Sequence, residues 1–190
     1  GSYRSTVRID PFAVPLEKKI DDLRRATAPL RTGGAPVRYA EGRMDWVRVK
    51  KIFASTEGAR IDQETIHGGG GIHCVAVGDD GETQRRSYPT YYDGGIAQGG
   101  YEAFEAFEFA RHAPRVREEV VALLKAPLCP SGDRTVILES SQLALQIHES
   151  CGHPTELDRA LGTEISLAGG SFLTPDKLDH FRYGSERVTL

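Results

Sequence analysis

The feature that most constrains the fold is a long alternation of apolar and polar residues between Pro36 and Tyr91. Alternation with a period of two is typical of β-strands that bury one face, because successive side chains in a strand point to opposite sides of the sheet. The turn signals "TEG" and "DDGE" interrupt the pattern. It therefore predicts four or five antiparallel strands, over about residues 36–43, 46–54, 59–67, 72–78 and 82–90.

The predicted strand 46–54 also indicates which of its side chains are buried. In a half-covered antiparallel sheet, the apolar positions face a core and the charged positions face water. The prediction is Val47, Val49 and Ile52 or Phe53 inward, with Arg48, Lys50 and Lys51 outward.

Helical periodicity appears on both sides of this region. The stretch "VPLEKKIDDLRRATAPL" reads as an amphipathic helix, and a second helical segment covers about residues 101–127, where Pro114 is predicted to kink or split it. Further on, "TVILES" predicts a short strand and "SQLALQIHESCGH" a helix with Ser140 or Ser141 as N-cap. Strand–helix–strand alternation is missing, so the predicted class is α+β: an antiparallel β-sheet flanked by helices.

Composition excludes several classes of function. The chain has 190 residues and a formal net charge of −3 at pH 7, which gives no general attraction to nucleic acid or anionic membrane. No apolar run approaches the roughly 18–20 residues of a membrane span, and the amino terminus lacks a signal-peptide pattern. Three separated cysteines, Cys74, Cys129 and Cys151, indicate reduced thiols. We therefore expect a cytoplasmic protein that binds neither nucleic acid nor membrane.

A glycine run, "HGGGGIHC", invites comparison with phosphate-binding loops. It lacks the spacing of those motifs, and a predicted strand follows it where a helix is required. A flexible hairpin connection or bulge is the favoured interpretation. His67 and His73 flank the run without a third ligand nearby, so ordinary strand histidines are favoured over a metal pair.

The stretch "LQIHESCGHPTELDR" contains an HExxxH motif made of His148, Glu149 and His153. A hydrolytic zinc site needs imidazole ligands and a carboxylate that takes a proton from water. Histidines five residues apart on a regular α-helix point about 140° away from each other, so they cannot share a metal. A π-bulge would bring them together, as would a left-handed Gly152 that ends the helix before Pro154. We favour the second distortion, because "GHP" is a stop signal.

Spacing alone leaves several interpretations open. Cys151, Glu156 and Asp158 are candidate local third ligands. Residues so close in sequence rarely occupy three corners of one tetrahedron, so a third ligand distant in sequence is favoured. In a non-catalytic interpretation the histidines and the glutamate are structural, within a peptide-binding or dimerisation module. In another, Cys151 is a nucleophile paired with His153. Residues two positions apart on a turn rarely align a thiol with an imidazole, which counts against this interpretation.

Four segments carry a resemblance to a known family: "TVILESSQLALQIHESCGHPTELDRALGTEISLAGGSFLTPDKL", "RYGSE", "SYPTYYDGGIAQGGYE" and "KIFASTEGARIDQE". Through them the sequence resembles the TldD/PmbA proteins, also described as modulators of DNA gyrase and as zinc metalloproteases. The resemblance implies that His148 and His153 bind Zn²⁺ and that Glu149 is the catalytic carboxylate. It also implies a third ligand, a cysteine from a carboxy-terminal β-rich domain.

The chain departs from the family pattern at its ends. It stops at Leu190, before a counterpart of that domain, and none of its cysteines stands at the distant ligand position. We therefore expect residues 1–190 to form a truncated TldD-like amino-terminal domain, in which 135–190 carry the motif helix and the start of the link to the missing domain. The resemblance implies hydrolysis of unfolded peptides, with this piece inactive alone, and a dimer with a like or related chain.

Overall fold

The computed structural model describes residues 1–34, 36–90 and 94–188. Contacts within the chain divide it into two units, Gly1–Pro130 and Ser131–Leu190, and each is described by itself. None of the helices in the described ranges is long and apolar enough to cross a membrane.

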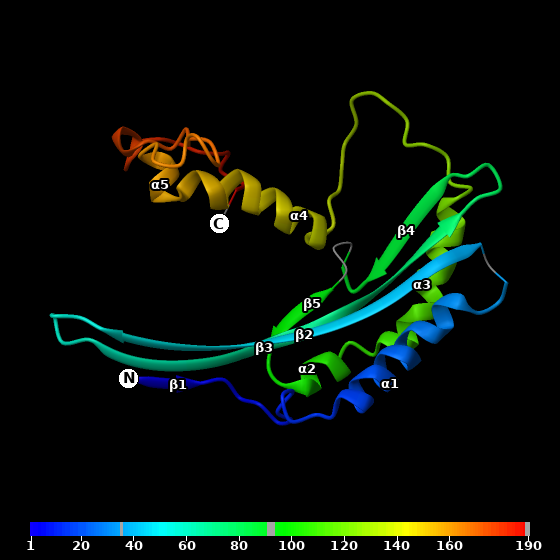
Figure 1. The fold of residues 1–190 in the computed structure, drawn as a ribbon. Helices are drawn as coiled ribbons and strands as arrows, with labels where there is room; N and C mark the ends of the chain where they lie inside the picture. The colour runs from blue at the N-terminus through cyan, green and yellow to red at the C-terminus, as the bar shows by residue number, and fades with distance from the viewer. Residues whose placement is uncertain (35, 91–93, 189–190) are drawn as a thin grey trace. The chain divides into compact units, whose positions relative to one another are not determined.

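The first unit is built on a β-sheet with one central strand. β3 (Arg60–Val77) pairs antiparallel with β2 (Val37–Ala54), β4 (Thr83–Tyr88) and β5 (Gly95–Gln98), and parallel with β1 (Ser2–Arg4). β2 and β3 have 18 residues each and form one long hairpin, which crosses the centre of Figure 1. The predicted α+β fold with an antiparallel sheet is confirmed.

The predicted strand boundaries are wrong in the middle of this hairpin. The predicted strands 36–43 and 46–54 are one continuous strand, β2, and the predicted strands 59–67 and 72–78 are both part of β3. The glycine run therefore lies inside β3, with Gly68 paired to Trp46, and not in a hairpin connection. Alternation cannot reveal such a strand, because glycine has no side chain to alternate.

The glycines of β3 allow aromatic rings to lie directly on the sheet. A Cβ atom added to Gly68 would lie 2.0 Å from Cδ1 of Trp46. The Trp46 ring stacks on Tyr101 with centroids 5.2 Å apart, and its Nε1 donates a hydrogen bond of 3.2 Å to the carbonyl oxygen of Gly100. Close approach of a ring to the backbone explains why a strand contains glycine here.

Three helices lie along one face of this sheet (Figure 1): α1 (Leu16–Thr27), α2 (Tyr101–Glu105) and α3 (Phe109–Leu123). α1 confirms the predicted amphipathic helix. The helices and the sheet enclose a core of buried residues: Ala26, Leu30, Ile72, Cys74, Ala76, Tyr101, Phe104, Phe109, Ala113, Val116 and Val120.

The second helical segment is split, but not where it was predicted. The break falls at residues 106–108, between α2 and α3, where Glu108 has a left-handed backbone with φ of 48°. Pro114 lies inside α3 and does not end it. A residue with positive φ cannot continue a right-handed helix, which explains the position of the break.

The predicted burial of 46–54 is confirmed for the charged residues Arg48, Lys50 and Lys51, which are exposed, and wrong for most of the apolar ones. Val49 is half-buried, but Val47 is 54% exposed, and Ile52 and Phe53, one of which was predicted to face a core, are 76% and 54% exposed. Met44 and Trp46 pack against the core, so Val47 points to the opposite face of the sheet. Ile52 and Phe53 are close to the end of β2, in the part of the hairpin that extends beyond the helices in Figure 1. The alternation identified a strand correctly, but it could not show how far along the strand the helices reach.

The second unit contains short helical elements and little core. α4 (Ser140–Ile147) continues into a π turn (His148–Gly152), a 3₁₀ turn (His153–Thr155) and α5 (Leu157–Ala160), and another 3₁₀ turn covers Pro175–Lys177. The strand predicted for "TVILES" does not form: residues 135–139 have no regular structure, Ser140 begins α4, and Val136 and Ile137 are 69% and 95% exposed.

We predict that Gly68→Ala destabilises the first unit. The added methyl group would overlap the Trp46 ring, and overpacking of this kind costs about 1–3 kcal/mol. Urea denaturation followed by fluorescence of Trp46, the single tryptophan of the chain, measures the change. Gly170→Ala is the matched control, because its Cβ would meet only ordinary contacts at 3.8 Å and beyond. Equal midpoints for Gly68→Ala and the wild type would contradict the packing described here.

A carboxylate joins the amino-terminal segment to the start of α2. Glu102 accepts hydrogen bonds from the backbone N–H groups of Arg8, Ile9 and Gly100, at 2.9, 3.0 and 3.1 Å. Burial alone would raise the pKa of Glu102, but the N–H groups outweigh burial and lower this pKa from 4.5 to about 2. The folded pKa lies below the unfolded one, so the stabilisation is complete above about pH 4.5 and is lost as the pH falls towards 2.

We predict that Glu102→Gln lowers the free energy of unfolding at pH 7 by roughly 1–3 kcal/mol, because a neutral amide accepts these hydrogen bonds more weakly. The variant should also lose less stability than the wild type between pH 4.5 and 2. Urea denaturation at several pH values tests both points. Glu105→Gln is the control, since the Glu105 side chain is 46% exposed and lies 3.8 Å from Nζ of Lys18. Equal losses in the two variants would contradict the assigned role of Glu102.

Candidate metal centre

The candidate site begins at the amino-terminal end of α4. Glu139 caps the helix, because its side chain accepts a hydrogen bond of 3.0 Å from the backbone N–H of Ser141. The predicted cap, Ser140 or Ser141, is therefore one or two residues late. The cap starts a helix that reaches the motif residues two turns later.

The helix changes its hydrogen-bond pattern at the motif. The backbone N–H of His153 donates to the carbonyl oxygen of His148, which is the i to i+5 bond of a π turn. Gly152 keeps right-handed angles, with φ −61° and ψ −62°. The predicted distortion is confirmed, but the left-handed Gly152 that we favoured is wrong and the π-bulge is right. A left-handed Gly152 would end the helix, whereas the helix continues through Gly152 into a 3₁₀ turn.

Side chains bind three carbonyl groups at the carboxyl end of this helical segment. The Tyr183 hydroxyl donates to the carbonyl oxygen of Ser150, from 33 residues further along the chain. Thr155 Oγ1 lies 2.9 Å from the carbonyl oxygens of both Cys151 and Gly152. A regular helix would pair the carbonyl groups of Cys151 and Gly152 with backbone N–H groups, whereas Pro154 has no N–H to offer the carbonyl group of Ser150.

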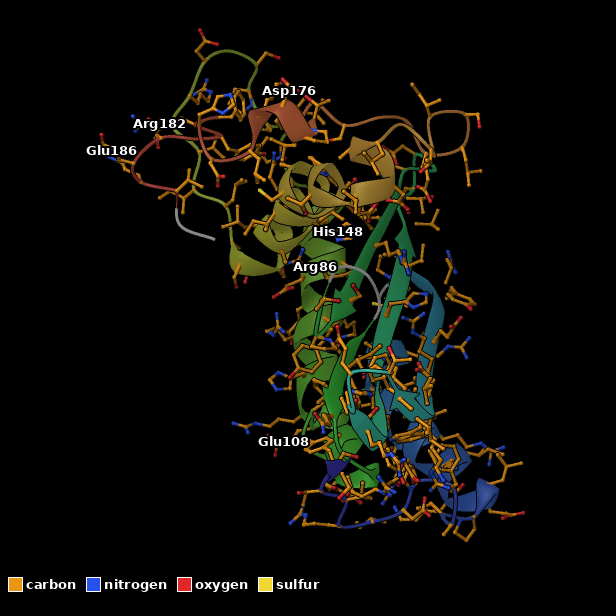
Figure 2. All side chains as sticks on the ribbon, turned by 90° about the vertical axis from the view of Figure 1, so that its left-hand side faces the viewer. Arg86, Glu108, His148, Asp176, Arg182 and Glu186 are labelled. Carbon is orange, nitrogen blue, oxygen red and sulfur yellow. The ribbon has the colours of Figure 1, made fainter. Side chains whose placement is uncertain are left out.

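The π turn brings the three motif residues together. The His148 and His153 rings lie with centroids 4.4 Å apart and an interplanar angle of 71°. One ligand atom from each of His148, Glu149 and His153 lies within 4.8 Å of the other two. Figure 2 shows His148 on this helical segment, with Arg182 and Glu186 on the segment that ends the same unit. The sequence predicted this set, and the structure places its members side by side.

The geometry of these residues fits a zinc ion. Two nitrogen ligands of tetrahedral zinc lie roughly 3.4 Å apart, since Zn–N bonds are about 2.0–2.1 Å long. The ligand atoms here lie within 4.8 Å of one another, which is compatible with one shared ion. The Glu149 side chain is 57% exposed, and its Oε2 lies 3.4 Å from Nε2 of His153. The arrangement offers two imidazole ligands with an accessible carboxylate beside them.

Carboxylates lie on both sides of the His153 ring. Nε2 faces Glu149, and Nδ1 lies 3.3 Å from Oε1 of Glu156. Glu156 in turn forms an ion pair of 2.6 Å with Nε of Arg159. Sequence spacing marked Glu156 only as a candidate third ligand, whereas the structure places it on the ring nitrogen that points away from the cluster.

The cysteines lie outside the cluster. Cys151 is near Tyr183, with Sγ 3.7 Å from the hydroxyl oxygen, and is not among the residues that gather around His148. Cys74 is buried in the core of the first unit, where burial raises the pKa of its thiol to about 11, and Cys129 is exposed. The described clusters of potential ligands include neither His67 nor His73. Tyr183 is a residue that spacing could not reveal, because it is far from the motif in sequence.

The family of the chain follows from comparison with known proteins. Residues 9–126 match the PmbA/TldA metallopeptidase central domain. The chain belongs to this family. The match covers more than half of the chain and ends before α4, so the motif is compared through individual relatives.

Two relatives extend the comparison across the motif. The chain is 30% identical over 192 residues to metalloprotease MJ0996 of Methanocaldococcus jannaschii, in an alignment that covers 100% of the chain and 38% of the relative. It is 27% identical over 171 residues to a metalloprotease of Archaeoglobus fulgidus, covering 89% of the chain and 37% of the relative. The chain thus spans about two fifths of the length of these relatives. A metallopeptidase family implies a metal, and the resemblance to TldD/PmbA proteins is confirmed.

We predict that Tyr183→Phe loosens the π turn. The substitution removes one hydroxyl hydrogen bond to Ser150 but keeps the ring, which stacks on Phe172 with centroids 5.6 Å apart. A loss of about 1 kcal/mol should speed amide hydrogen exchange at His153 about five-fold. Tyr3→Phe is the control, because it removes a hydroxyl contact with Gln98 in the first unit. Unchanged exchange at His153 would show that Tyr183 does not hold the turn.

Proposed function

We propose that this chain carries the catalytic motif of a zinc-dependent peptidase of the TldD type. The observation that carries the proposal is the π turn, which gathers His148, Glu149 and His153 so that their ligand atoms lie within 4.8 Å of one another. Membership of a metallopeptidase family supports it. His148 and His153 are the proposed zinc ligands, and Glu149 is the proposed catalytic base.

Each residue has a distinct role in this mechanism. When bound, Zn²⁺ supplies Lewis acidity towards a water molecule and a peptide carbonyl group. Glu149 accepts the proton of the attacking water and passes it to the leaving amine nitrogen, which is general base and then general acid catalysis. The exposed Glu149 side chain is accessible to a peptide from outside. His148 and His153 hold their positions because they belong to one turn of helix.

Two imidazoles do not complete a catalytic zinc site, which uses three protein ligands and keeps one open position. We propose a cysteine thiolate from the carboxy-terminal β-rich domain of TldD-type proteins as the third ligand. Residues 1–190 are accordingly inactive alone. The proposed substrates are unfolded peptides, the proposed assembly is a dimer with a like or related chain, and the proposed compartment is the cytoplasm.

One observation favours a second candidate function. Both ring nitrogens of His153 face carboxylates, at 3.4 and 3.3 Å, as in a structural ion-pair network. In this alternative the cluster stabilises a non-catalytic peptide-binding or dimerisation module. Metal content separates the two functions, because only the peptidase requires bound zinc.

We predict that Glu149→Gln in the full-length protein keeps zinc and lowers peptide hydrolysis at least about 100-fold, since it removes only the base. His148→Ala should lose both zinc and hydrolysis. Elemental analysis and a peptidase assay measure the two properties. His180→Ala is the control, because His180 is an exposed histidine of the same unit, its Nδ1 lies 2.9 Å from the carbonyl oxygen of Leu178, and it belongs to neither group of potential ligands among the described residues.

Two results would decide against the peptidase. Undiminished hydrolysis by Glu149→Gln would remove the proposed base from the mechanism. Wild-type protein without zinc, together with an unchanged His148→Ala variant, would favour the non-catalytic module.

A further inference from the structure

The segment after the motif contains an acidic cluster that the proposed mechanism does not use. Glu156, Asp158 and Glu164 offer carboxylate oxygens within 4.8 Å of one another. Arg159 lies among them, with Nε 2.6 Å from Glu156 and 3.8 Å from Glu164. The guanidinium already supplies the positive charge that these carboxylates require, so the cluster does not indicate a second cation site.

Arg159 is held firmly by the backbone of its own unit. Its side chain is only 17% exposed, and Nη1 donates a hydrogen bond of 3.2 Å to the carbonyl oxygen of Ala168. The backbone N–H of Ser171 donates to the carbonyl oxygen of Arg159, also at 3.2 Å. Nε of Arg159 makes no hydrogen bond, so its contact with Glu156 is an ion pair. A guanidinium held in place can still orient a carboxylate beside it, because its charge attracts one oxygen and leaves the other for a different donor.

The second oxygen of Glu156 lies on the His153 ring. Arg159 contacts Oε2, and Oε1 lies 3.3 Å from Nδ1 of His153. A neutral imidazole that donates Nδ1–H to a carboxylate has its lone pair on Nε2. Nε2 is the nitrogen that faces Glu149 and the proposed metal position. Metal-binding histidines commonly donate their other N–H to a carboxylate in this way, which fixes the ring and raises the basicity of the ligand.

We propose that Glu156 is a positioning residue for His153 and that Arg159 orients Glu156. This inference rests on the proposed function, because it assigns Glu156 to the orientation of a zinc ligand. Glu156 holds His153 as the Nδ1–H tautomer with Nε2 directed towards His148 and Glu149, and it does not bind the metal itself. The line from Arg159 through Glu156 to His153 follows the spacing i, i+3, i+6 in "HPTELDR".

The first experiment measures the zinc dissociation constant of the full-length protein by competition with a chelator. Glu156→Ala should weaken zinc binding about 10- to 100-fold, as is typical when the partner of a metal-binding histidine is removed. Glu156→Gln should restore affinity to within about five-fold of the wild type, because the amide oxygen still accepts from Nδ1–H. Arg159→Gln should fall between the two.

Asp158→Asn is the matched control for these variants. Asp158 belongs to the same acidic cluster, but its side chain accepts a hydrogen bond of 2.9 Å from the backbone N–H of Arg159, the next residue. Its zinc affinity should stay within about two-fold of the wild type. Equal weakening in Asp158→Asn and Glu156→Ala would mean that only the total negative charge matters, and would overturn the proposal.

The Glu156→Gln variant separates a positioning residue from a ligand. If Glu156 bound the metal, the amide would weaken affinity as much as alanine and would change the absorption spectrum of the Co²⁺-substituted protein. In the proposed arrangement the donor atoms stay the same, so the Glu156→Gln spectrum should match the wild type. A changed spectrum with strongly weakened binding would make Glu156 a ligand and overturn the inference.

A measurement without metal distinguishes failure of this inference from failure of the proposed function. Nitrogen chemical shifts of His153, measured in metal-free protein at a pH where imidazole is neutral, report the tautomer. The wild type should show Nδ1–H, and Glu156→Ala should shift the population towards Nε2–H. Unchanged tautomers would overturn the positioning role even if zinc binds. A shifted tautomer in a protein that binds no zinc would confirm the contact between Glu156 and His153. It would refute the proposed peptidase, and with it the role of Glu156 in positioning a zinc ligand.

Discussion

The hydrogen bond from the N–H of His153 to the carbonyl oxygen of His148 is the interaction on which the candidate site depends. On a regular α-helix, side chains five residues apart point about 140° away from each other. The π turn removes this separation and places the two rings 4.4 Å apart. Further contacts surround the turn: Tyr183 and Thr155 bind carbonyl groups of Ser150 and Cys151, and Glu156 contacts the His153 ring.

Sequence pattern predicted the fold class and missed its details for two physical reasons. Alternation and helical spacing are properties of side chains, and both identified elements where side chains differ between two faces. The run around Gly68 has no side chains, so the pattern could not show that β3 continues through it. The burial of individual side chains could not be predicted either. Phe53 fits the alternation of a buried face but is 54% exposed, because its surroundings depend on helices distant in sequence.

The candidate site was more predictable than the sheet, because its members are close in sequence. Spacing showed that His148 and His153 require a distorted helix, and residue types showed what Glu149 can do there. The form of the distortion was not predictable: "GHP" favours a stop, whereas the structure continues the helix through Gly152. Tyr183 contributes through a contact between residues 33 positions apart, which only the folded chain brings together.

The second unit differs from the first in what holds it together. Among its described residues none of the large apolar side chains is fully buried, whereas the first unit encloses a core between sheet and helices. Polar contacts around the π turn therefore have a larger share in its local stability, and such contacts contribute only about 0.5–1.5 kcal/mol each. A ligand that binds only the folded arrangement adds stability by mass action, about 2.7 kcal/mol at a concentration 100 times its dissociation constant. Zinc bound at His148 and His153 would thus stabilise the turn that forms its own site.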